Sequence, residues 1–317
     1  MAFSLLSPRA QGILLVLFSV VVWSGWMVFS SQGVRGTLSP YDLTALRFGT
    51  AGLLLLPVLF KKGFRLGPWG IWSGMLLACL MGATYNTLTI YGMRFAPVSH
   101  LGLINTGMLI VTTLGGIFLL KEKTSSLRIT GIFISLAGIA CLLAANAVGD
   151  AYPRIHLGHL TFFIGGSMWA AYALLAKAWK LDPLHTTAAV CVYSALLFLP
   201  IYFLFLPSHI TWENAREAAF QAGYQGILNS IFALLCYNRA IGLIGATTSS
   251  AFLPLIPVLA TLAAIPILNE TPLAQEWLGI ALASGGVLLS TGIASRLLTR
   301  DRRLPLATPR DGAAAGN

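Results

Sequence analysis

Ten apolar runs dominate this sequence, and each is about as long as a helix that crosses a lipid bilayer. A bilayer core about 30 Å thick requires about 20 residues of α-helix. The runs lie near residues 10–31, 39–59, 68–92, 96–119, 127–147, 156–177, 183–206, 217–241, 245–268 and 275–295. Only 9% of the residues are charged, against about 25% in a soluble domain. The sequence therefore predicts an all-α membrane protein with ten transmembrane helices, and it excludes a disordered chain, a disulfide scaffold and a cytosolic enzyme.

The basic residues predict how these helices are oriented. With the N-terminus in the cytoplasm, fifteen Lys and Arg residues fall in cytoplasmic segments and four on the opposite side. This bias, with an even number of spans, predicts a multi-pass protein of the inner (plasma) membrane whose termini are both cytoplasmic. The net charge of +10 therefore reflects topology and does not indicate a nucleic-acid partner. Residues 296–317 are expected to form a disordered cytoplasmic tail.

The two halves of the chain match each other when one is shifted by about 146 residues. Gly12 and Trp23 then align with Gly158 and Trp169. The other matches pair Pro40 with Pro183, Pro57 with Pro200, Tyr91 with Tyr237, Glu122 with Glu270, Gly131 with Gly279 and Gly138 with Gly286. Each half holds five helices, an odd number, so the second half must enter the membrane inverted. Inverted repeats are typical of secondary transporters, whose binding site lies near the midplane between the halves.

Three segments carry a resemblance to a known family. They are GIFLLKEKTSSLRITGIFISLAGIACLL, its counterpart AIPILNETPLAQEWLGIALASGGVLLS, and Arg47 with Phe48 early in the second run. Through them the chain resembles the ten-helix EamA-type branch of the drug/metabolite transporter superfamily, with one repeat at 10–147 and an inverted repeat at 156–295. The resemblance implies export of a small metabolite, such as an amino acid, by alternating access through a central cavity. It also implies that the first four helices of each half line the cavity and that the fifth supports it.

Aromatic and amide side chains within the runs are candidates for the substrate-binding site. Trp23 and Trp169 occupy matching positions near mid-span, where the aromatic belt at the membrane interface does not explain them well. Amides are costly against lipid and should turn inward, which makes Asn86 and Asn229 candidate substrate contacts. Hydrogen bonding between helices is the alternative for both. The remaining aromatic and hydroxyl candidates are Tyr85, Thr106 and Tyr237.

Prolines in the ninth run predict a broken helix. Pro254 and Pro257 lack an N–H group, so the carbonyls of Ser250 and Leu253, one turn earlier, are expected to lose their partners. Lipid cannot satisfy a free carbonyl, so this backbone should face protein or a water-filled cavity. The two prolines are therefore candidate points of helix breaking and gating.

Two cationic or titratable residues each have two interpretations. His100 begins the fourth run and is either an interfacial histidine bonded to backbone or a binding and titrating group near the transport path. Arg47 lies inside the second run, where it either snorkels outward or holds a substrate carboxylate or backbone carbonyls. Its counterpart in the second repeat is Val190, so any role of this cation is not duplicated.

The motifs of membrane-embedded enzymes are missing from the sequence. It contains no HExxH, no GxSxG, no P-loop and no cluster of His with carboxylates, which argues against catalysis. A face of small or polar residues in the fourth run recurs in the ninth run at a shift of 148: Ser99, Gly102, Thr106 and Thr113 match Thr247, Ser250, Pro254 and Thr261. A structural or sensory protein would not need such mirrored faces, so a transporter is the leading interpretation. No metal or cofactor is expected. The expected partners are a small-molecule substrate and the lipid bilayer, and small-residue faces on the fifth and tenth runs predict close helix packing or a homodimer.

The acidic residues bear on how transport would be driven. No Asp or Glu lies in the middle of a run, whereas proton-driven carriers commonly use an intramembrane carboxylate. Facilitated diffusion or exchange is therefore expected. Proton-coupled antiport that uses His100 is the alternative, because no other titratable group that changes charge near neutral pH lies close to the proposed path.

Overall fold

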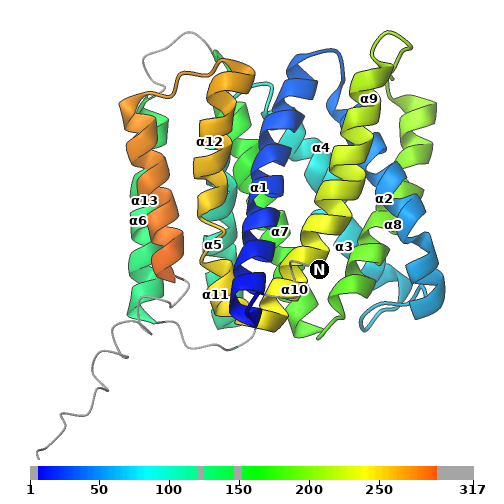
Figure 1. The fold of residues 1–317 in the computed structure, drawn as a ribbon, viewed down its shortest axis with the longest axis horizontal. Coiled ribbons are helices and arrows are strands. Elements are labelled where there is room, and N and C mark those ends of the chain that lie inside the picture. The colour runs from blue at the N-terminus through cyan, green and yellow to red at the C-terminus, as the bar shows by residue number, and fades with distance from the viewer. Residues whose placement is uncertain (1–5, 120, 122–124, 146–151, 291–317) are drawn as a thin grey trace, which may run out of the picture.

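A computed structural model describes residues 6–119, 121, 125–145 and 152–290, so the tail expected at 296–317 lies outside the described residues. These described segments form helices and contain no strand (Figure 1). The helices are α1 (Pro8–Arg35), α2 (Pro40–Lys62), α3 (Ile71–Met81), α4 (Ala83–Gly92), the 3₁₀ segment η2 (Val98–Leu101), α5 (Gly102–Phe118), α6 (Ser126–Ala145), α7 (Ile155–Ala178), α8 (Pro183–Phe205), α9 (Ala215–Gln221), the π-helical segment η4 (Ala222–Phe232), α10 (Ala233–Ile244), α11 (Ala246–Ser250), α12 (Leu255–Leu268) and α13 (Ala274–Ser290).

Seven helices in the described part of the chain are long and apolar enough to cross a bilayer. They span Pro8–Arg35, Pro40–Lys62, Ser126–Ala144, Ile155–Ala178, Pro183–Phe205, Ala215–Ile244 and Thr248–Leu268. A shorter apolar helix covers Gly107–Phe118. The expected all-helical membrane fold is confirmed to this extent.

The second helix of each repeat begins at a side-chain cap. At α2, Ser39 Oγ accepts a hydrogen bond from Asp42 N at 3.1 Å, and Asp42 Oδ2 accepts one from Ser39 N at 2.7 Å. At α8, Asp182 Oδ1 accepts from His185 N at 2.7 Å. A proline follows each cap, where its missing N–H group costs nothing. Local sequence thus sets both helix starts.

Two helical segments that cross the bundle contain an irregular stretch of backbone, one between α3 and α4 and one between α9 and α10. Gly82 separates α3 from α4, and a Cβ atom there would collide with Ser194 Oγ and the Ala78 carbonyl. Ser194 Oγ instead accepts a hydrogen bond from Ala83 N at 3.2 Å. Between α9 and α10 the backbone is π-helical over Ala222–Phe232. Such wide turns commonly occur at functional sites.

The proline-rich break before α12 is built differently from the sequence prediction. Ser250 O accepts a hydrogen bond from Leu253 N at 3.2 Å, and Leu253 O accepts one from Ile256 N at 3.0 Å. The prediction that these carbonyls lose their partners is therefore wrong. The chain tightens into successive turns, so an N–H group three residues ahead replaces the one that Pro254 or Pro257 lacks.

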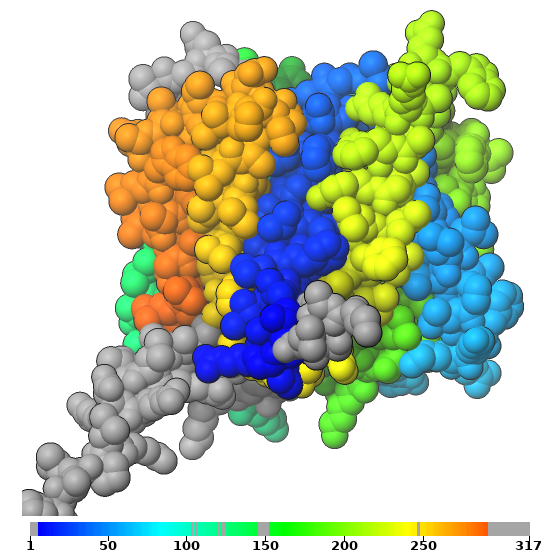
Figure 2. All heavy atoms as spheres, viewed as in Figure 1, coloured from blue at the N-terminus to red at the C-terminus, as the bar shows by residue number. Residues whose placement is uncertain are grey.

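Helix α1 lies between α12 on one side and α10 on the other (Figures 1 and 2). It thereby brings the first half of the chain against two helices of the second half. Helix α2 packs against α8, and α5 packs against α7. Every one of these contacts joins the two halves, so the interface between them runs through the centre of the bundle.

Helices α6 and α13 pack closely against each other at one side of the bundle (Figure 1). A Cβ atom on Gly131 would collide with the Gly286 carbonyl, and one on Gly138 would come within 2.6 Å of the Gly279 carbonyl. Small residues let two membrane helices approach in this way. The small-residue faces expected on the fifth and tenth runs are therefore buried against each other within one chain.

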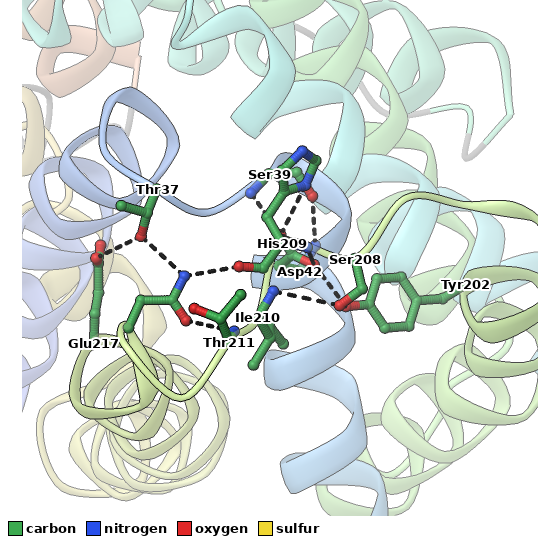
Figure 3. A network of polar contacts seen from close by, with 10 residues as sticks. Thr37, Ser39, Asp42, Tyr202, Ser208, His209, Ile210, Thr211 and Glu217 are labelled. Carbon is green, nitrogen blue, oxygen red and sulfur yellow. Dashed lines mark hydrogen bonds and ion pairs between the residues drawn. The ribbon is translucent and has the colours of Figure 1, made fainter.

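A polar network joins the two halves at the end of the bundle that is uppermost in Figure 1. Figure 3 shows Asp42 at its centre: Asp42 Oδ1 accepts from Tyr202 Oη at 2.6 Å and from His209 N at 3.3 Å. Nearby, Thr37 Oγ1 donates to Glu217 Oε2 at 3.2 Å. The connection between α1 and α2 is thus tied to the connection between α8 and α9.

Candidate functional site

A central cavity of about 260 Å³ lies at the interface between the two halves. Its volume is slightly below the roughly 300 to 1,000 Å³ of most ligand pockets, so it suits a small molecule. Helices of both halves line it, and α6 and α13 contribute no lining residue. The lining residues are Trp23, Trp26, Met27, Arg47, Phe48, Met81, Tyr85, Ile104, Trp169, Tyr172, Thr187, Val190, Cys191, Asn229, Ser230, Leu234, Tyr237, Asn238 and Ile256.

Two aromatic pairs form parts of the cavity wall, and each pair joins the two halves. Trp23 of α1 packs against Tyr237 of α10, with ring centroids 5.1 Å apart and planes inclined by 57°. Tyr85 of α4 packs against Trp169 of α7, with centroids 6.3 Å apart. All four were candidates from the sequence, and all four line the cavity. Stacked or tilted aromatic pairs add about 0.5–1.5 kcal/mol beyond their buried area, so these walls are well supported.

Arg47 is the cationic residue of the cavity lining, and its side chain turns into the protein rather than outward. The residue is 9% exposed. Its Nη1 donates to Asn86 Oδ1 at 2.8 Å, and its Nε donates to Ser230 Oγ at 3.0 Å. The guanidinium also lies over the rings of Trp26 and Phe48, at 5.7 and 5.3 Å from their centroids. No carboxylate of the described residues forms an ion pair with it.

The two asparagines predicted as substrate contacts play different parts. Asn229 lines the cavity, and its Oδ1 has no hydrogen-bond partner among the described residues. Asn86 is fully buried and is not among the lining residues. It accepts from Arg47 and donates through Nδ2 to Thr44 Oγ1 at 3.0 Å. Asn86 therefore positions Arg47. This is the alternative of hydrogen bonding between helices that the sequence left open.

His100 lies outside the central cavity, in a buried group of ionisable residues towards the upper end. Its Nε2 is 2.8 Å from Glu276 Oε1, and its Nδ1 is 2.7 Å from His159 Nε2. The two imidazole rings stack with centroids 4.9 Å apart. His100 is thus not among the lining residues of the cavity, and its two ring nitrogens contact ionisable side chains. The sequence pointed to neither of its partners, because they lie on α13 and α7, far along the chain.

Two further predicted site residues, Pro254 and Pro257, are not among the lining residues. Pro254 is the N-cap of α12, and Pro257 is buried in its first turn. Between them, Ile256 reaches the cavity, so the break positions a lining residue without lining the cavity itself. The side chain of Thr106 lies outside the described residues.

Charged groups at the upper end of the bundle are paired across the two halves. Arg35 Nη2 donates to Glu270 Oε1 at 2.7 Å, and Val98 N donates to the same carboxylate. Burial raises the pKa of the Glu270 carboxyl above its usual range, although the neighbouring Arg35 guanidinium acts in the opposite direction. No group of three or more His, Cys, Asp or Glu side chains in the described segments is arranged to hold a metal ion.

Comparison with known proteins finds transporters that match over most of their length. An "Uncharacterized transporter" of Archaeoglobus fulgidus is 24% identical over 88% of this chain and 96% of its own. The "Uncharacterized inner membrane transporter YedA" of Escherichia coli K12 is 24% identical over 88% of this chain and 90% of its own. A solved crystal structure shares the fold, with a TM-score of 0.59 and 22% identity over 91% of this chain and 99% of the other.

The model of one transporter family matches the chain twice. The two matches cover residues 10–144 and 156–292, most of the protein, and each contains helices that line the central cavity. The protein is a multi-pass membrane transporter and not an enzyme. The chain belongs to the EamA-like transporter family.

Proposed function

We propose that this chain exports a small metabolite, such as an amino acid, through the central cavity by alternating access between its two halves. One observation carries the proposal: the central cavity lies between the two family repeats, and both contribute to its walls. Inverted-repeat transporters bind substrate near the midplane, between the repeats, and rock one half against the other. The breaks at Gly82 and before α12 provide places where such motion can be absorbed.

The proposal includes a topology of ten crossings with both termini in the cytoplasm. In it, α3 with α4, η2 with α5, the segment α9–η4–α10 and the pair α11–α12 each count as one crossing. The excess of basic residues on one side supports this orientation, which makes the upper end of Figure 1 the outer side of the inner (plasma) membrane. If the chain forms a homodimer, a surface other than the buried glycine faces of α6 and α13 carries it.

The outer polar contacts then act as a closed gate. The Asp42 network and the Arg35–Glu270 ion pair each join one half to the other. Opening the cavity outward requires these contacts to break. When such a contact breaks, water replaces the protein partner, so the net free-energy cost of breaking it is modest. The outward-closed and outward-open states can therefore interconvert.

We further propose facilitated diffusion or exchange, because no described lining residue is a carboxylate. Proton-coupled antiport through His100 is the second candidate, and one observation favours it: His100 contacts both Glu276 and His159 in a buried site. Proton movement through that group would change a buried charge next to the outer connections of α12 and α13.

Counterflow in proteoliposomes tests the transport proposal. Vesicles are loaded with an unlabelled metabolite, and uptake of the labelled compound is followed for panels of amino acids, nucleosides and drugs. Transient accumulation above the external level is expected for at least one compound and in no protein-free vesicle. Absence of saturable flux across the panels would contradict transport through this cavity.

An imposed pH gradient decides between the two energy couplings. Facilitated transport predicts flux that follows only the substrate gradient. Uphill accumulation driven by the pH gradient, abolished in His100→Gln and retained in His156→Gln, would instead establish proton coupling. His156 is a suitable control because it is exposed on the same helix as His159.

A further inference from the structure

We infer that the substrate is a small carboxylate with an aromatic or apolar body, that Arg47 binds its carboxylate, and that no ammonium group is needed for recognition. The inference rests on the proposed function, because it treats the central cavity as the transport site. It goes beyond that proposal by assigning the charge, the anchoring residue and the chemical class of the substrate.

The first step is the charge of Arg47. A guanidinium stays protonated and carries five N–H donors. The described residues accept from two of its nitrogen atoms, Nε and Nη1, and both acceptors, Ser230 and Asn86, are neutral. Removing an ion from water costs several kcal/mol when no counter-ion compensates for it. A carboxylate in the cavity would provide the missing charge and could accept two parallel hydrogen bonds from the guanidinium.

The second step is the way Arg47 is held. Asn86, which accepts from Nη1, is itself bonded to Thr44, and Thr87 also donates to Thr44. On the other side, Ser230 accepts from Nε and donates to the Gln225 carbonyl in the π-helical segment. Both halves of the chain therefore fix the guanidinium. A donor fixed in advance loses less entropy when a ligand binds.

The third step is the remainder of the cavity. The cavity wall also includes the aromatic pairs Trp23–Tyr237 and Tyr85–Trp169, and Val190 lines it at the position that matches Arg47 in the second repeat. Such walls favour a flat or branched apolar group. A substrate with one charged end and an apolar body matches this asymmetry.

The fourth step concerns a second polar group on the substrate. No described lining residue is acidic, so an ammonium group would meet a like charge and no counter-ion. Asn229 Oδ1 and Trp26 Nε1, in contrast, are buried polar atoms without a partner in the described segments. The amide oxygen suits a neutral N–H or O–H donor, and the indole N–H suits a carboxylate oxygen. An N-acylated amino acid therefore fits the cavity better than the free zwitterion.

A panel with one phenyl ring in common tests the class. The ligands are 3-phenylpropionate, N-acetylphenylalanine, phenylalanine, N-acetylphenylalanine methyl ester and phenethylamine, and binding to the full-length purified protein is measured by calorimetry. We expect the two carboxylates without an ammonium group to bind. Phenylalanine should bind about tenfold more weakly than N-acetylphenylalanine, and the ester and the amine should not bind measurably. Binding of the ester or the amine as tight as that of 3-phenylpropionate, or no binding by any carboxylate, would overturn the inference.

Substitution of Arg47 tests the anchor. Arg47→Gln should weaken carboxylate binding by about tenfold or more, and Arg47→Lys should recover only part of the loss because it lacks the planar fork. The elution profile and melting temperature of each variant report folding, and the wild-type panel decides the matter even if Arg47→Gln does not fold. Unchanged carboxylate affinity in a folded Arg47→Gln protein would contradict the assignment.

Flux separates this inference from the proposed function. Carboxylates that bind without counterflow would support the site and overturn transport. Counterflow of phenethylamine with none of 3-phenylpropionate would support transport and overturn the carboxylate class.

Discussion

Two arginines of the first repeat, Arg35 and Arg47, occupy opposite electrostatic situations. Arg35 lies at the upper end, its side chain is 25% exposed, and it contacts the Glu270 carboxylate at 2.7 Å. Arg47 lies deeper and is only 9% exposed, yet its hydrogen-bond partners are neutral. If charge pairing served stability alone, the deeper cation would need the carboxylate more. Arg35 therefore joins the two halves through its ion pair, whereas under the inference above a substrate carboxylate matches the charge of Arg47.

The two repeats contribute similar aromatic residues to the cavity but differ in charge. Trp23 and Trp169 preserve the internal repeat, whereas Arg47 faces a cavity that has Val190 at the matching position. The symmetric residues supply shape, and the asymmetric one supplies charge. A substrate with unlike ends would account for that division.

Giving Arg47 a carboxylate of its own should have the largest effect. In Asn86→Asp the new carboxylate would lie at the place of an oxygen that is 2.8 Å from Nη1, so Arg47 would resemble Arg35. We expect carboxylate binding to fall by well over about tenfold, or more than about 1.4 kcal/mol, while the melting temperature stays the same or rises. Calorimetry and thermal unfolding measure the two effects.

The matched control for this charge compensation is Asn86→Ser, which removes the hydrogen bond but adds no charge. It should weaken binding less than Asn86→Asp does. If both variants lost the same carboxylate affinity, the position of the guanidinium would govern binding, and its uncompensated charge would not.

Removing an aromatic wall should have an intermediate effect that is similar in both halves. Trp23→Ala and Trp169→Ala each remove one partner of a ring pair, and we expect flux per folded molecule to fall by about three- to tenfold, in line with roughly 0.5–1.5 kcal/mol for the lost contact. Expression should change less than flux. Trp→Phe at each position should restore part of the activity, and unchanged flux in both alanine variants would refute the wall assignment.

The raised pKa of Glu270, the partner of Arg35, should make the stability of the protein depend on pH. Burial raises the pKa of the Glu270 carboxyl in the folded protein above its usual range, so the folded state favours the protonated carboxyl. This contribution to stability is fully present below the pKa of the unfolded chain and is lost as the pH rises through the folded pKa. The melting temperature of the wild type should therefore fall over that window, and Glu270→Gln should flatten the decline. If the melting temperature fell more steeply with pH in Glu270→Gln than in the wild type, the pKa of Glu270 would be lowered by folding, not raised.

The sequence predicted the aromatic part of the site better than the charged part. Trp23 and Trp169 could be found because the internal repeat places both near mid-span. The partners of Arg47 could not, because Asn86 and Ser230 lie on helices whose packing no spacing within one run reveals. Asn86 and Asn229 had the same amide chemistry in the sequence, and only the packing separates a residue that positions Arg47 from one that lines the cavity.

Backbone irregularities limited the prediction in a second way. The π-helical turns at Ala222–Phe232 change which side chains share a face, and regular helical spacing does not describe them. The prolines correctly indicated a break before α12, but the carbonyl partners were wrong because tighter turns replace the missing bonds. His159 and Glu276 remained unassigned as partners of His100 since their contacts join three separate elements.

The smallest effect is expected at the lower end of the bundle, where Lys62 and Asp182 form another cation–carboxylate contact. Their charged atoms are 2.7 Å apart, but the side chains are 38% and 51% exposed. Solvent screens such a pair, so Lys62→Met should cost no more than about 1 kcal/mol of unfolding free energy. Asp182→Ala should cost about 1 kcal/mol more, because it also removes the cap that accepts from His185 N.

The pH dependence of this exposed pair should have the opposite sign to that of Glu270. The hydrogen bond from Lys62, followed by that from the His185 amide, lowers the pKa of Asp182. Its contribution is present above the pKa of the unfolded chain and is lost as the pH falls through the folded value. Acid unfolding of Lys62→Met should show a slightly weaker loss of stability over that range than the wild type. Carboxylate binding should be unchanged in Lys62→Met. If Lys62→Met weakened carboxylate binding as much as Asn86→Asp does, an exposed charge outside the cavity lining would control binding. The contrast between Arg47 and the paired cations would then fail.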